Sequence, residues 1–207
     1  ASREGEMREG IICDLKRFAV HDGPGVRSTV FLKGCPLRCV WCHNPESIRR
    51  APELGVRFHK CTLCGECARV CACHRIADGK HRFGRESCTA CGRCVGACLF
   101  DALVLYGKRV TPEETAAAVL EDRAFYETSG GGVTVSGGEP LLQPEFLADL
   151  FRAMHNNPDG RVHTCLDSCG YAFDPKHPEK FGTGIIDGIA ASEASNNAAT
   201  GGAMVPL

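Results

Sequence analysis

The order of apolar and polar positions along the chain predicts short strands separated by amphipathic helices. Val133 to Val135 form a β-branched run that is typical of a buried strand. The stretch 162–171 alternates between apolar and polar residues and ends in polar ones, as a further strand would. We therefore expect three core strands, at approximately residues 28–34, 132–137 and 162–167.

Two helices are predicted around the second of these strands. One begins at Thr111, which can cap it, with Pro112 in the first turn. Its apolar residues recur at helical spacing, at Ala116, Val119, Leu120 and Ala124. The other begins at Pro144 and has one apolar face, made by Phe146, Leu147, Leu150, Phe151 and Met154. Strand–loop–helix units in series imply parallel strands with right-handed crossovers, which predicts an α/β fold.

Charge and composition exclude several classes of function. The chain of 207 residues has a net charge of −1, which gives no electrostatic case for binding nucleic acid or an anionic membrane. It has no apolar run of about 18 residues that predicts a membrane span, and its first residues do not resemble a signal peptide. We therefore expect a cytoplasmic protein whose 15 cysteines serve metals more than disulfides.

Cys35, Cys39 and Cys42 are the most informative cysteines, with the spacing C-x3-C-x2-C. They supply three thiolates, one fewer than a [4Fe–4S] cluster needs, so one iron would have no protein ligand. An open coordination position is what separates a catalytic metal site from a structural one. The alternatives are a zinc site or three unrelated buried thiols.

Eight further cysteines form an internal repeat. Residues 61–71 and 88–98 both read C-x2-C-G-x-C-x3-C, offset by 27 residues. Gly65 and Gly92 allow the backbone to curl around a cluster with its amides directed at sulfur. Two quartets of thiolates suit two clusters, whereas paired zinc knuckles are the alternative. The other four cysteines are interpreted as packing or incidental thiols: Cys13, Cys73, Cys165 and Cys169.

Polar residues follow two of the predicted strands at their carboxyl ends, where α/β folds bind ligands. Gly137 and Gly138 allow the backbone to approach a ligand closely, and Glu139 adds a carboxylate. Asp167 and Ser168 end the last predicted strand. Taken alone, the first segment is also consistent with an ordinary turn, and the second with a solvated strand-to-helix turn.

Together these motifs resemble those of radical S-adenosylmethionine (SAM) enzymes. Residues 22–27, Asp-Gly-Pro-Gly-Val-Arg, and 31–34, Phe-Leu-Lys-Gly, narrow the resemblance to the activating enzymes of glycyl radical enzymes. The resemblance covers roughly residues 8–174. It implies a partial (βα) radical SAM barrel, truncated to about three units, with an inserted two-cluster ferredoxin-like domain.

The resemblance also implies a division of the chain and a set of cluster ligands. The radical SAM core would comprise residues 8–58 and 106–174, with the ferredoxin-like insert at 59–105. The SAM cluster would be held by Cys35, Cys39 and Cys42. In two-cluster ferredoxins the fourth cysteine of each run ligates the other cluster. One auxiliary cluster would then be held by Cys61, Cys64, Cys67 and Cys98. The second would be held by Cys88, Cys91, Cys94 and Cys71.

The implied activity is reductive cleavage of SAM to a 5′-deoxyadenosyl radical, which generates a glycyl radical on a partner enzyme. Its electron would come from a flavodoxin or a ferredoxin-type reductant. SAM would be bound by Trp41, Gly137, Gly138, Glu139, Asp167 and Ser168, and no catalytic residue beyond these and the cluster ligands is implied. The alternatives are an iron–sulfur electron-transfer protein and an inactive truncated fragment.

The composition changes near residue 176. The region 175–207 has no cysteine and is rich in alanine, asparagine and glycine. Around residues 193–199, Glu-Ala-Ser-Asn-Asn-Ala-Ala, it resembles a segment of the large membrane subunit of tripartite tricarboxylate transporters. We expect an atypical tail that does not complete the barrel, so that the sheet ends open after its third core strand.

Overall fold

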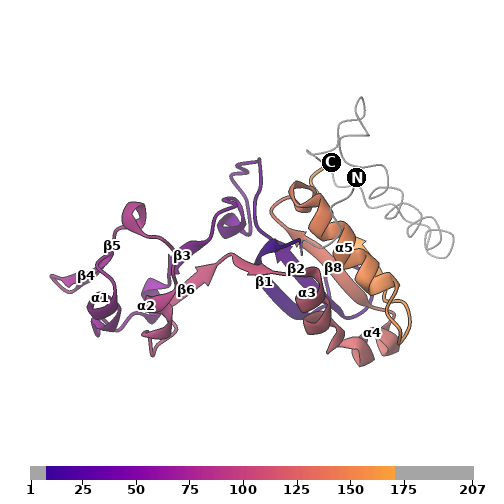
Figure 1. The fold of residues 1–207 in the computed structure, drawn as a ribbon. Coiled ribbons are helices and arrows are strands. Elements are labelled where there is room, and N and C mark those ends of the chain that lie inside the picture. Colours follow the sequence, from indigo (N-terminus) through magenta and orange to yellow (C-terminus); the bar gives the residue numbers. More distant parts are fainter. Residues whose placement is uncertain (1–7, 171–207) are drawn as a thin grey trace.

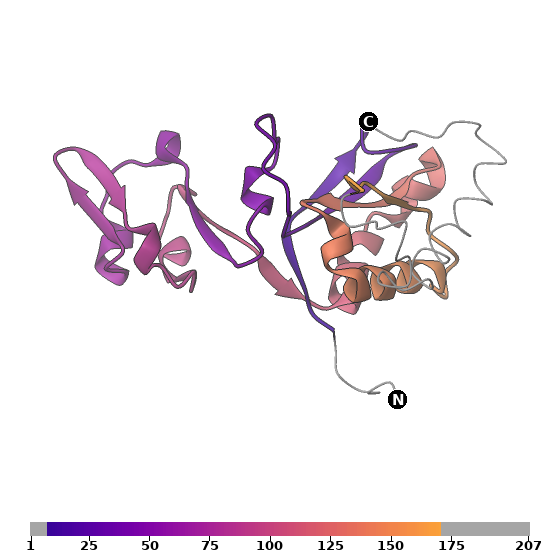
Figure 2. The ribbon, with the colours of Figure 1, turned by 90° about the horizontal axis from the view of Figure 1, so that it is seen from above.

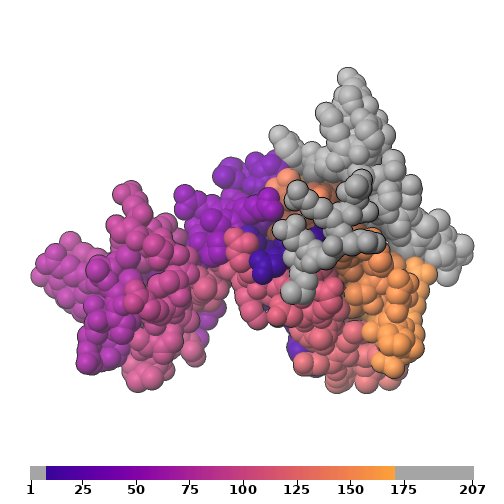
Figure 3. Space-filling view, in the orientation of Figure 1, coloured from indigo at the N-terminus to yellow at the C-terminus, as the bar shows by residue number. Residues whose placement is uncertain are grey.

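The structure, a computed structural model, describes residues 8–170 and contains two lobes (Figures 1 and 2). The sheet lobe comprises residues 8–34 and 108–170. The cysteine-rich lobe comprises residues 53–106, and a narrow neck joins the two in the view of Figure 3. The expected tail at 175–207, and with it the question of how the barrel ends, lies outside the described residues. No helix within residues 8–170 is long and apolar enough to cross a membrane.

The sheet lobe is built on a five-stranded sheet in the order β7–β1–β2–β8–β9. The strands are β1 (Gly10–Ala19), β2 (Arg27–Leu32), β7 (Lys108–Val110), β8 (Gly132–Gly137) and β9 (Thr164–Leu166). β2 pairs with β8 and β8 with β9, both in parallel. These three strands coincide closely with the three core strands predicted from the sequence, and the mixed α/β class is confirmed.

The sequence did not predict the other two strands, β1, which pairs antiparallel with β2, and β7, which pairs antiparallel with β1. β1 pairs with β2 through two register shifts, between Ile12 and Asp14 and between Lys16 and Ala19. Such irregularities break the two-residue alternation by which a strand is recognised. β7 has three residues, too few to show an alternation at all.

Three helices accompany the sheet: α3 (Pro112–Leu120), α4 (Arg123–Ser129) and α5 (Pro144–His155). α3 begins with a capping box, in which Thr111 and Glu114 each accept a hydrogen bond from the other's backbone N–H. The predicted helical pattern to Ala124 is interrupted, because α3 ends before Asp122 and a separate helix follows. The buried carboxylate of Asp122 accepts hydrogen bonds from Ser28 at 2.6 Å and Arg17 at 3.1 Å, which holds this break against the sheet.

The two faces of the sheet differ in character. Val30, Leu32, Val133 and Val135 pack with α3 and α5 in the main hydrophobic core, and the predicted apolar face of α5 is buried there. Alternate positions on β2 and β8 face the other side and are mostly polar, with Phe31 on β2 as the large apolar exception. There the Arg27 guanidinium donates to Thr134 Oγ1 at 2.6 Å, and burial lowers the pKa of Arg27. This polar face leads to the carboxyl ends of the parallel strands.

The cysteine-rich lobe consists of short elements. β3 (Glu53–Val56) and β6 (Leu103–Tyr106) form an antiparallel ribbon, and β4 (His74–Ala77) and β5 (Lys80–Phe83) form a hairpin. The helices α1 (Glu66–Val70) and α2 (Arg93–Gly96) lie within the two repeats and begin at corresponding positions. The chain also makes single 3-10 turns at Pro45–Ser47, Phe58–Lys60, Arg85–Ser87 and Pro140–Leu142.

Lys33 holds the neck between the two lobes. Its side chain is fully buried, and its ammonium donates to the Glu46 carbonyl and to Glu53 Oε2. Glu53 begins β3, so the ion pair ties the end of β2 to the start of the cysteine-rich lobe. A Cβ on Gly107, where the chain returns, would lie 2.9 Å from Lys33 Cδ. The segments by which the chain enters and leaves the cysteine-rich lobe therefore pack around one lysine side chain.

Candidate functional site

The carboxyl ends of β2 and β8 bring together the two segments that the sequence singled out. The Gly138 N–H donates to the Leu32 carbonyl at 3.0 Å, and the Glu139 N–H donates to the Gly34 carbonyl at 2.8 Å. Gly34 is followed directly by Cys35, the first residue of the three-cysteine motif. The Gly-Gly-Glu segment and the base of the three-cysteine loop are thus hydrogen-bonded to each other at one edge of the sheet.

The two glycines of this segment are required by contacts within the protein. A Cβ on Gly137 would lie 2.3 Å from the Leu32 carbonyl oxygen, and one on Gly138 would lie 2.2 Å from the Gly34 carbonyl oxygen. Gly137 also has a φ of +116°, which disfavours any side chain. From the sequence we expect close approach to a ligand. In the structure the close approach is to the backbone at the end of β2.

Glu139 is the centre of a buried polar cluster. Its side chain is 1% exposed and accepts hydrogen bonds from the Leu141 N–H at 3.0 Å, Ser168 Oγ at 2.9 Å and the Cys169 N–H at 2.9 Å. The Cys169 thiol also donates to it, at 2.7 Å. Asp167 lies alongside and accepts from Ser136 Oγ at 2.7 Å. Of the predicted residues, Ser168 therefore contacts Glu139, and Asp167 precedes Ser168 in the chain and bonds to Ser136. Cys169, interpreted from the sequence as a packing thiol, contacts the same carboxylate.

The three-cysteine loop projects beyond this edge. It is anchored by hydrogen bonds from the Gly34 N–H to Ser47 and from the Cys35 N–H to Ile48, at 2.7 and 2.9 Å. Cys39 is exposed, whereas Cys35 and Cys42 are partly buried. Trp41 is 76% exposed at the loop's tip, so its packing against a cluster and an adenine stays a prediction.

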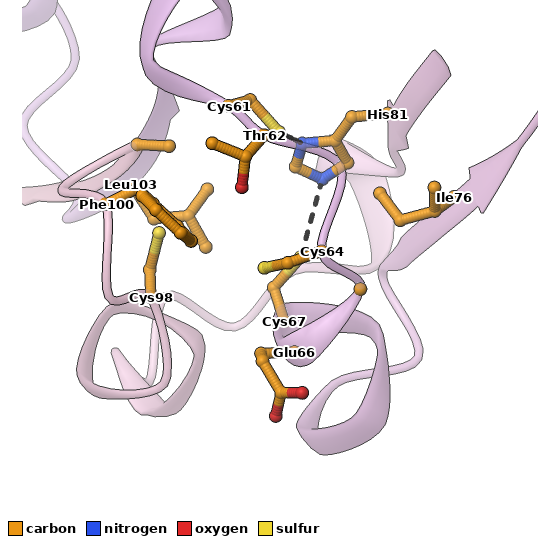
Figure 4. Close-up of a pocket in the computed structure, with 12 residues that line it drawn as sticks. Cys61, Thr62, Cys64, Glu66, Cys67, Ile76, His81, Cys98, Phe100 and Leu103 are labelled. Atoms are coloured by element: carbon orange, nitrogen blue, oxygen red, sulfur yellow. Dashed lines mark hydrogen bonds between the residues drawn. The ribbon is translucent and has the colours of Figure 1, made fainter. Parts of the chain in front are cut away.

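Cysteines of the two repeats gather around two separate cavities in the cysteine-rich lobe. One cavity is lined by Cys61, Cys64, Cys67 and Cys98 (Figure 4). The other is lined by Cys71, Cys88, Cys91 and Cys94. Each cavity takes one cysteine from the opposite repeat, which is the grouping that the resemblance to two-cluster ferredoxins implies. The ligand roles themselves stay a prediction.

The backbone of the two repeats has the same unusual conformation. Leu63 and Ala90 occupy equivalent positions, and both have positive φ, at 62° and 53°. Gly65 and Gly92 are also equivalent, with φ of 84° and 75°. Non-glycine residues adopt this region at a cost, and such strain collects at ligand sites. One consequence is that the Ala90 N–H is directed at Cys88 Sγ, at 3.3 Å.

The environments of the thiols differ. The backbone N–H and side chain of Arg93 lower the pKa of Cys91 to about 7, whereas burial raises the pKa of Cys67 and of Cys94. Cys73 also lines the second cavity, where it contacts Cys71 and Cys88. The pKa of its thiol is raised, first by burial and then by these two neighbouring thiols. Sequence reasoning assigned this cysteine no role, although its two-residue spacing from Cys71 was visible.

The donor chemistry fits iron–sulfur clusters. Eleven cysteines make up one trio in the loop and two quartets in the cysteine-rich lobe, and thiolates are the ligands of [4Fe–4S] clusters. Sequence reasoning overlooked two histidines, His74 and His81, which lie buried beside the first quartet. Burial lowers the pKa of both. No spacing rule points to them, because the β4–β5 hairpin brings them to the cysteines.

Comparison with known proteins gives two family matches. A family model described as "4Fe-4S single cluster domain" matches residues 21–181. A model described as "Tripartite tricarboxylate transporter TctA family" matches residues 167–207, in keeping with the resemblance noted for the tail. Asp167 and Ser168 fall within both matched ranges.

Curated relatives match most of the chain. The isethionate sulfite-lyase activating enzyme of Nitratidesulfovibrio vulgaris is 45% identical over 170 residues, 79% of this chain and 54% of the relative. The (2S)-3-sulfopropanediol dehydratase activating enzyme of Klebsiella oxytoca is 47% identical, over 78% of this chain and 52% of the relative. The benzylsuccinate synthase activating enzyme of Thauera aromatica is 39% identical, over 87% and 56%. The chain therefore spans about half the length of these relatives.

Proposed function

Because the chain belongs to the 4Fe-4S single cluster domain family and is similar over most of its length to activating enzymes of glycyl radical enzymes, we propose that it is the N-terminal portion of such an enzyme. The observation that supports this best is the hydrogen bond between Glu139 and Gly34. It places the three-cysteine loop and a buried carboxylate at the same carboxyl edge of a parallel sheet.

The clusters and SAM would supply the electron-transfer and radical chemistry. One electron would cleave the sulfonium C–S bond of SAM to give methionine and a 5′-deoxyadenosyl radical, which takes a hydrogen atom from the Cα of a glycine in the partner enzyme. A flavodoxin or a ferredoxin-type protein would supply that electron. Cys35, Cys39 and Cys42 would hold the cluster that binds SAM and leave one coordination position open.

The residues at the sheet edge would bind and orient SAM. The buried carboxylate of Glu139 would accept the methionine ammonium, a charge-assisted contact that is strong where water is excluded. Asp167 and Ser168 would line the side of the methionine carboxylate. Ser168 and the Cys169 N–H already orient Glu139, so the carboxylate has a fixed direction before SAM arrives. Trp41 would pack near the cluster and the adenine.

We assign residues 8–58 and 106–174 to a radical SAM barrel truncated to about three units, and residues 59–105 to an inserted ferredoxin-like domain with two auxiliary [4Fe–4S] clusters. The region 175–207 would stand apart from the barrel. The grouping of the repeat cysteines around two cavities supports the two-cluster assignment.

Anaerobic reconstitution of the chain tests the proposal. We expect about twelve iron per chain, from four in each of three clusters. The loaded chain, with a chemical reductant, should convert SAM to 5′-deoxyadenosine and methionine. Saturation near four iron, or a preference for zinc, would refute the auxiliary clusters. Failure to form 5′-deoxyadenosine with all clusters present would refute the SAM chemistry.

The cysteine repeat favours a second candidate, an iron–sulfur protein that carries electrons without activating a partner. Two quartets of cysteines around separate cavities suit a pair of electron-transfer clusters and need no SAM. This candidate predicts reversible cluster reduction and no 5′-deoxyadenosine. Electron paramagnetic resonance (EPR) with a glycyl radical enzyme as partner separates the two, because only an activating enzyme yields a glycyl radical.

A further inference from the structure

Two buried histidines lie against the first cysteine quartet. His74 and His81 are 4% and 8% exposed, and they come from the two strands of the β4–β5 hairpin. His81 Nδ1 lies 3.6 Å from Cys61 Sγ, as Figure 4 shows, and its Nε2 lies 2.8 Å from His74 Nδ1. Nε2 is also 3.9 Å from Cys67 Sγ. The two rings and the Cys61 sulfur therefore form a short chain of contacts.

The negative charge on a metal-bound sulfur decides which atoms donate and which accept in the hydrogen bonds that link Cys61, His81 and His74. A thiolate accepts and does not donate, so it favours the arrangement in which His81 carries its proton on Nδ1. Nε2 of His81 is then an acceptor, and His74 donates to it from Nδ1. His74 Nε2 has no partner within residues 8–170, so it would be a bare acceptor, which costs less than an orphaned N–H. The opposite arrangement would direct the Nδ1 lone pair at the nearer thiolate, Cys61, at 3.6 Å, and would offer a proton from Nε2 towards His74 and the more distant Cys67 Sγ, at 3.9 Å.

The second quartet has no corresponding pair. The repeat offset of 27 residues carries His74 to Asp101 and His81 to Lys108, and no histidine lines the second cavity in the described part of the chain. The cation near that quartet is Arg93, beside Cys91 and open to solvent. Solvent screens an exposed charge, whereas a buried hydrogen bond acts in a medium of low dielectric. The two quartets, alike in their thiols, therefore differ in their buried surroundings.

We propose that His81, held in one tautomer by His74, donates a hydrogen bond to the Cys61 thiolate and thereby raises the reduction potential of the first auxiliary cluster above that of the second. This inference rests on the two auxiliary clusters of the proposed function. A reduced cluster carries more negative charge than an oxidised one, so a donor at its sulfur stabilises the reduced state more. His81 would be a positioning residue for electron flow, because it ligates nothing itself.

A mononuclear metal ion is the competing explanation. Cys67 Sγ and ring nitrogens of His74 and His81 lie within 4.8 Å of one another. However, two nitrogens on a tetrahedral zinc, at 2.0–2.1 Å from it, would be separated by about 3.3 Å. The observed separation of 2.8 Å between the two nitrogens fits a hydrogen bond better. Such an ion would also remove Cys67 from the first quartet.

A redox titration of the anaerobically reconstituted chain, monitored by EPR, tests the inference. Cys64→Ala identifies the signal of the first auxiliary cluster by its loss. We expect His81→Phe, which keeps the volume and removes the donor, to disfavour reduction of that cluster about tenfold, or about 59 mV for one electron. The other two clusters should keep their potentials. His81→Asn should restore most of the difference, because its amide can donate from a similar position.

Several results would overturn the inference. One is an unchanged potential of the first auxiliary cluster in His81→Phe with full iron content. Another is stoichiometric zinc in the parent chain that His81→Phe abolishes, which would establish the mononuclear site. If His81→Phe does not load iron, His74→Leu provides the test, since it removes only the support for the His81 tautomer. It should disfavour reduction of the same cluster by less than tenfold, that is, lower its potential by less than about 59 mV, and no change would overturn the inference. A parent chain that saturates near four iron refutes the auxiliary clusters directly, before any potential is compared.

Discussion

The two lobes of this chain are stabilised by different kinds of interior. In the sheet lobe, aliphatic and aromatic side chains of five strands and three helices form one continuous core, which includes the fully buried Val30, Leu147 and Leu150. In the cysteine-rich lobe the buried cluster consists of Leu54, Cys67, Cys94 and Leu103, with further cysteines packed around it. Half of that buried cluster is made of residues assigned to metal ligation.

This difference implies that the two lobes draw their folding stability from different sources. A small unit rarely buries enough apolar surface to offset its chain entropy, and proteins of that size commonly use a metal as a structural support. The short α1 and α2 helices and the strained Leu63 and Ala90 add little stability of their own. We infer that the sheet lobe is stable by burial, whereas the cysteine-rich lobe needs its clusters.

Removal of iron should therefore have the largest effect, and it should act on one lobe. In the chain without iron we expect residues 57–102, the part of the cysteine-rich lobe between β3 and β6, to lose protection from hydrogen exchange. The elements β2, β8 and α5 of the sheet lobe should keep their protection. Exchange followed by mass spectrometry of peptides from each lobe measures this. Equal loss of protection in both lobes would show that they fold as one unit through the Lys33 neck.

The next largest effect separates the two kinds of cluster. Cys39→Ala should abolish SAM cleavage, because it removes a ligand of the cluster that binds SAM. Cys64→Ala should spare part of the cleavage when a chemical reductant is supplied, because it damages an auxiliary cluster only. Product formation in the two variants, each with its iron content measured, gives the comparison. Complete loss in both with folding intact would show that the auxiliary clusters are obligatory.

Core truncation should affect the sheet lobe strongly. Leu150 is fully buried between α5 and the sheet, so Leu150→Ala should reduce the free energy of unfolding of this lobe by about 2–5 kcal/mol. Leu103→Ala in the cysteine-rich lobe is the matched control. With the clusters loaded, it should cost less, since metal ligation supplies most of that lobe's stability. Urea unfolding followed by circular dichroism measures both, and a larger loss in Leu103→Ala would contradict the comparison.

Glu139 tests the ligand site where the sheet lobe meets the three-cysteine loop. Glu139→Ala should weaken SAM binding by about 2–5 kcal/mol, the range for removing one partner of a buried charge pair, with the iron content unchanged. Glu139→Gln is the control for packing, because it keeps the volume and one oxygen acceptor while it removes the charge. Isothermal titration of SAM under anaerobic conditions gives the affinities. If both variants bound SAM with the parent's affinity, residues 137–139 would be a turn with no role in SAM binding.

The sequence predicted the parts of the fold that follow local periodicity. The three parallel strands and the buried face of α5 were visible because their apolar residues recur regularly over several positions. β1 was missed because its bulges disturb the alternation, and the break between α3 and α4 was missed because it depends on Asp122 reaching Ser28, far away in the sequence.

The candidate site divides in the same way. Cysteine spacing is a local signal, so the repeat could be found from the order of residues, whereas the exchange of the fourth cysteines between the quartets was implied by the resemblance to two-cluster ferredoxins. The contacts of His81 with Cys61 and of Cys169 with Glu139 depend on how a hairpin and a strand end are placed in space. The explanation of Gly137 and Gly138 also needed the structure, since the atoms they avoid belong to β2 and the loop after it.

The smallest expected effect concerns the capping box of α3, just where the chain re-enters the sheet lobe. Thr111→Ala removes the hydrogen bond between Thr111 Oγ1 and the Glu114 N–H, and should reduce the stability of the sheet lobe by about 1 kcal/mol. Thr111→Ser keeps the cap and should stay close to the parent. Because the box lies outside the cysteine-rich lobe, iron content and the protection of residues 57–102 should not change. Chemical denaturation and iron analysis of the same preparations measure both quantities. A loss of iron in Thr111→Ala would show that the start of α3 also supports the neck, and that the two lobes are coupled more tightly than their separate interiors suggest.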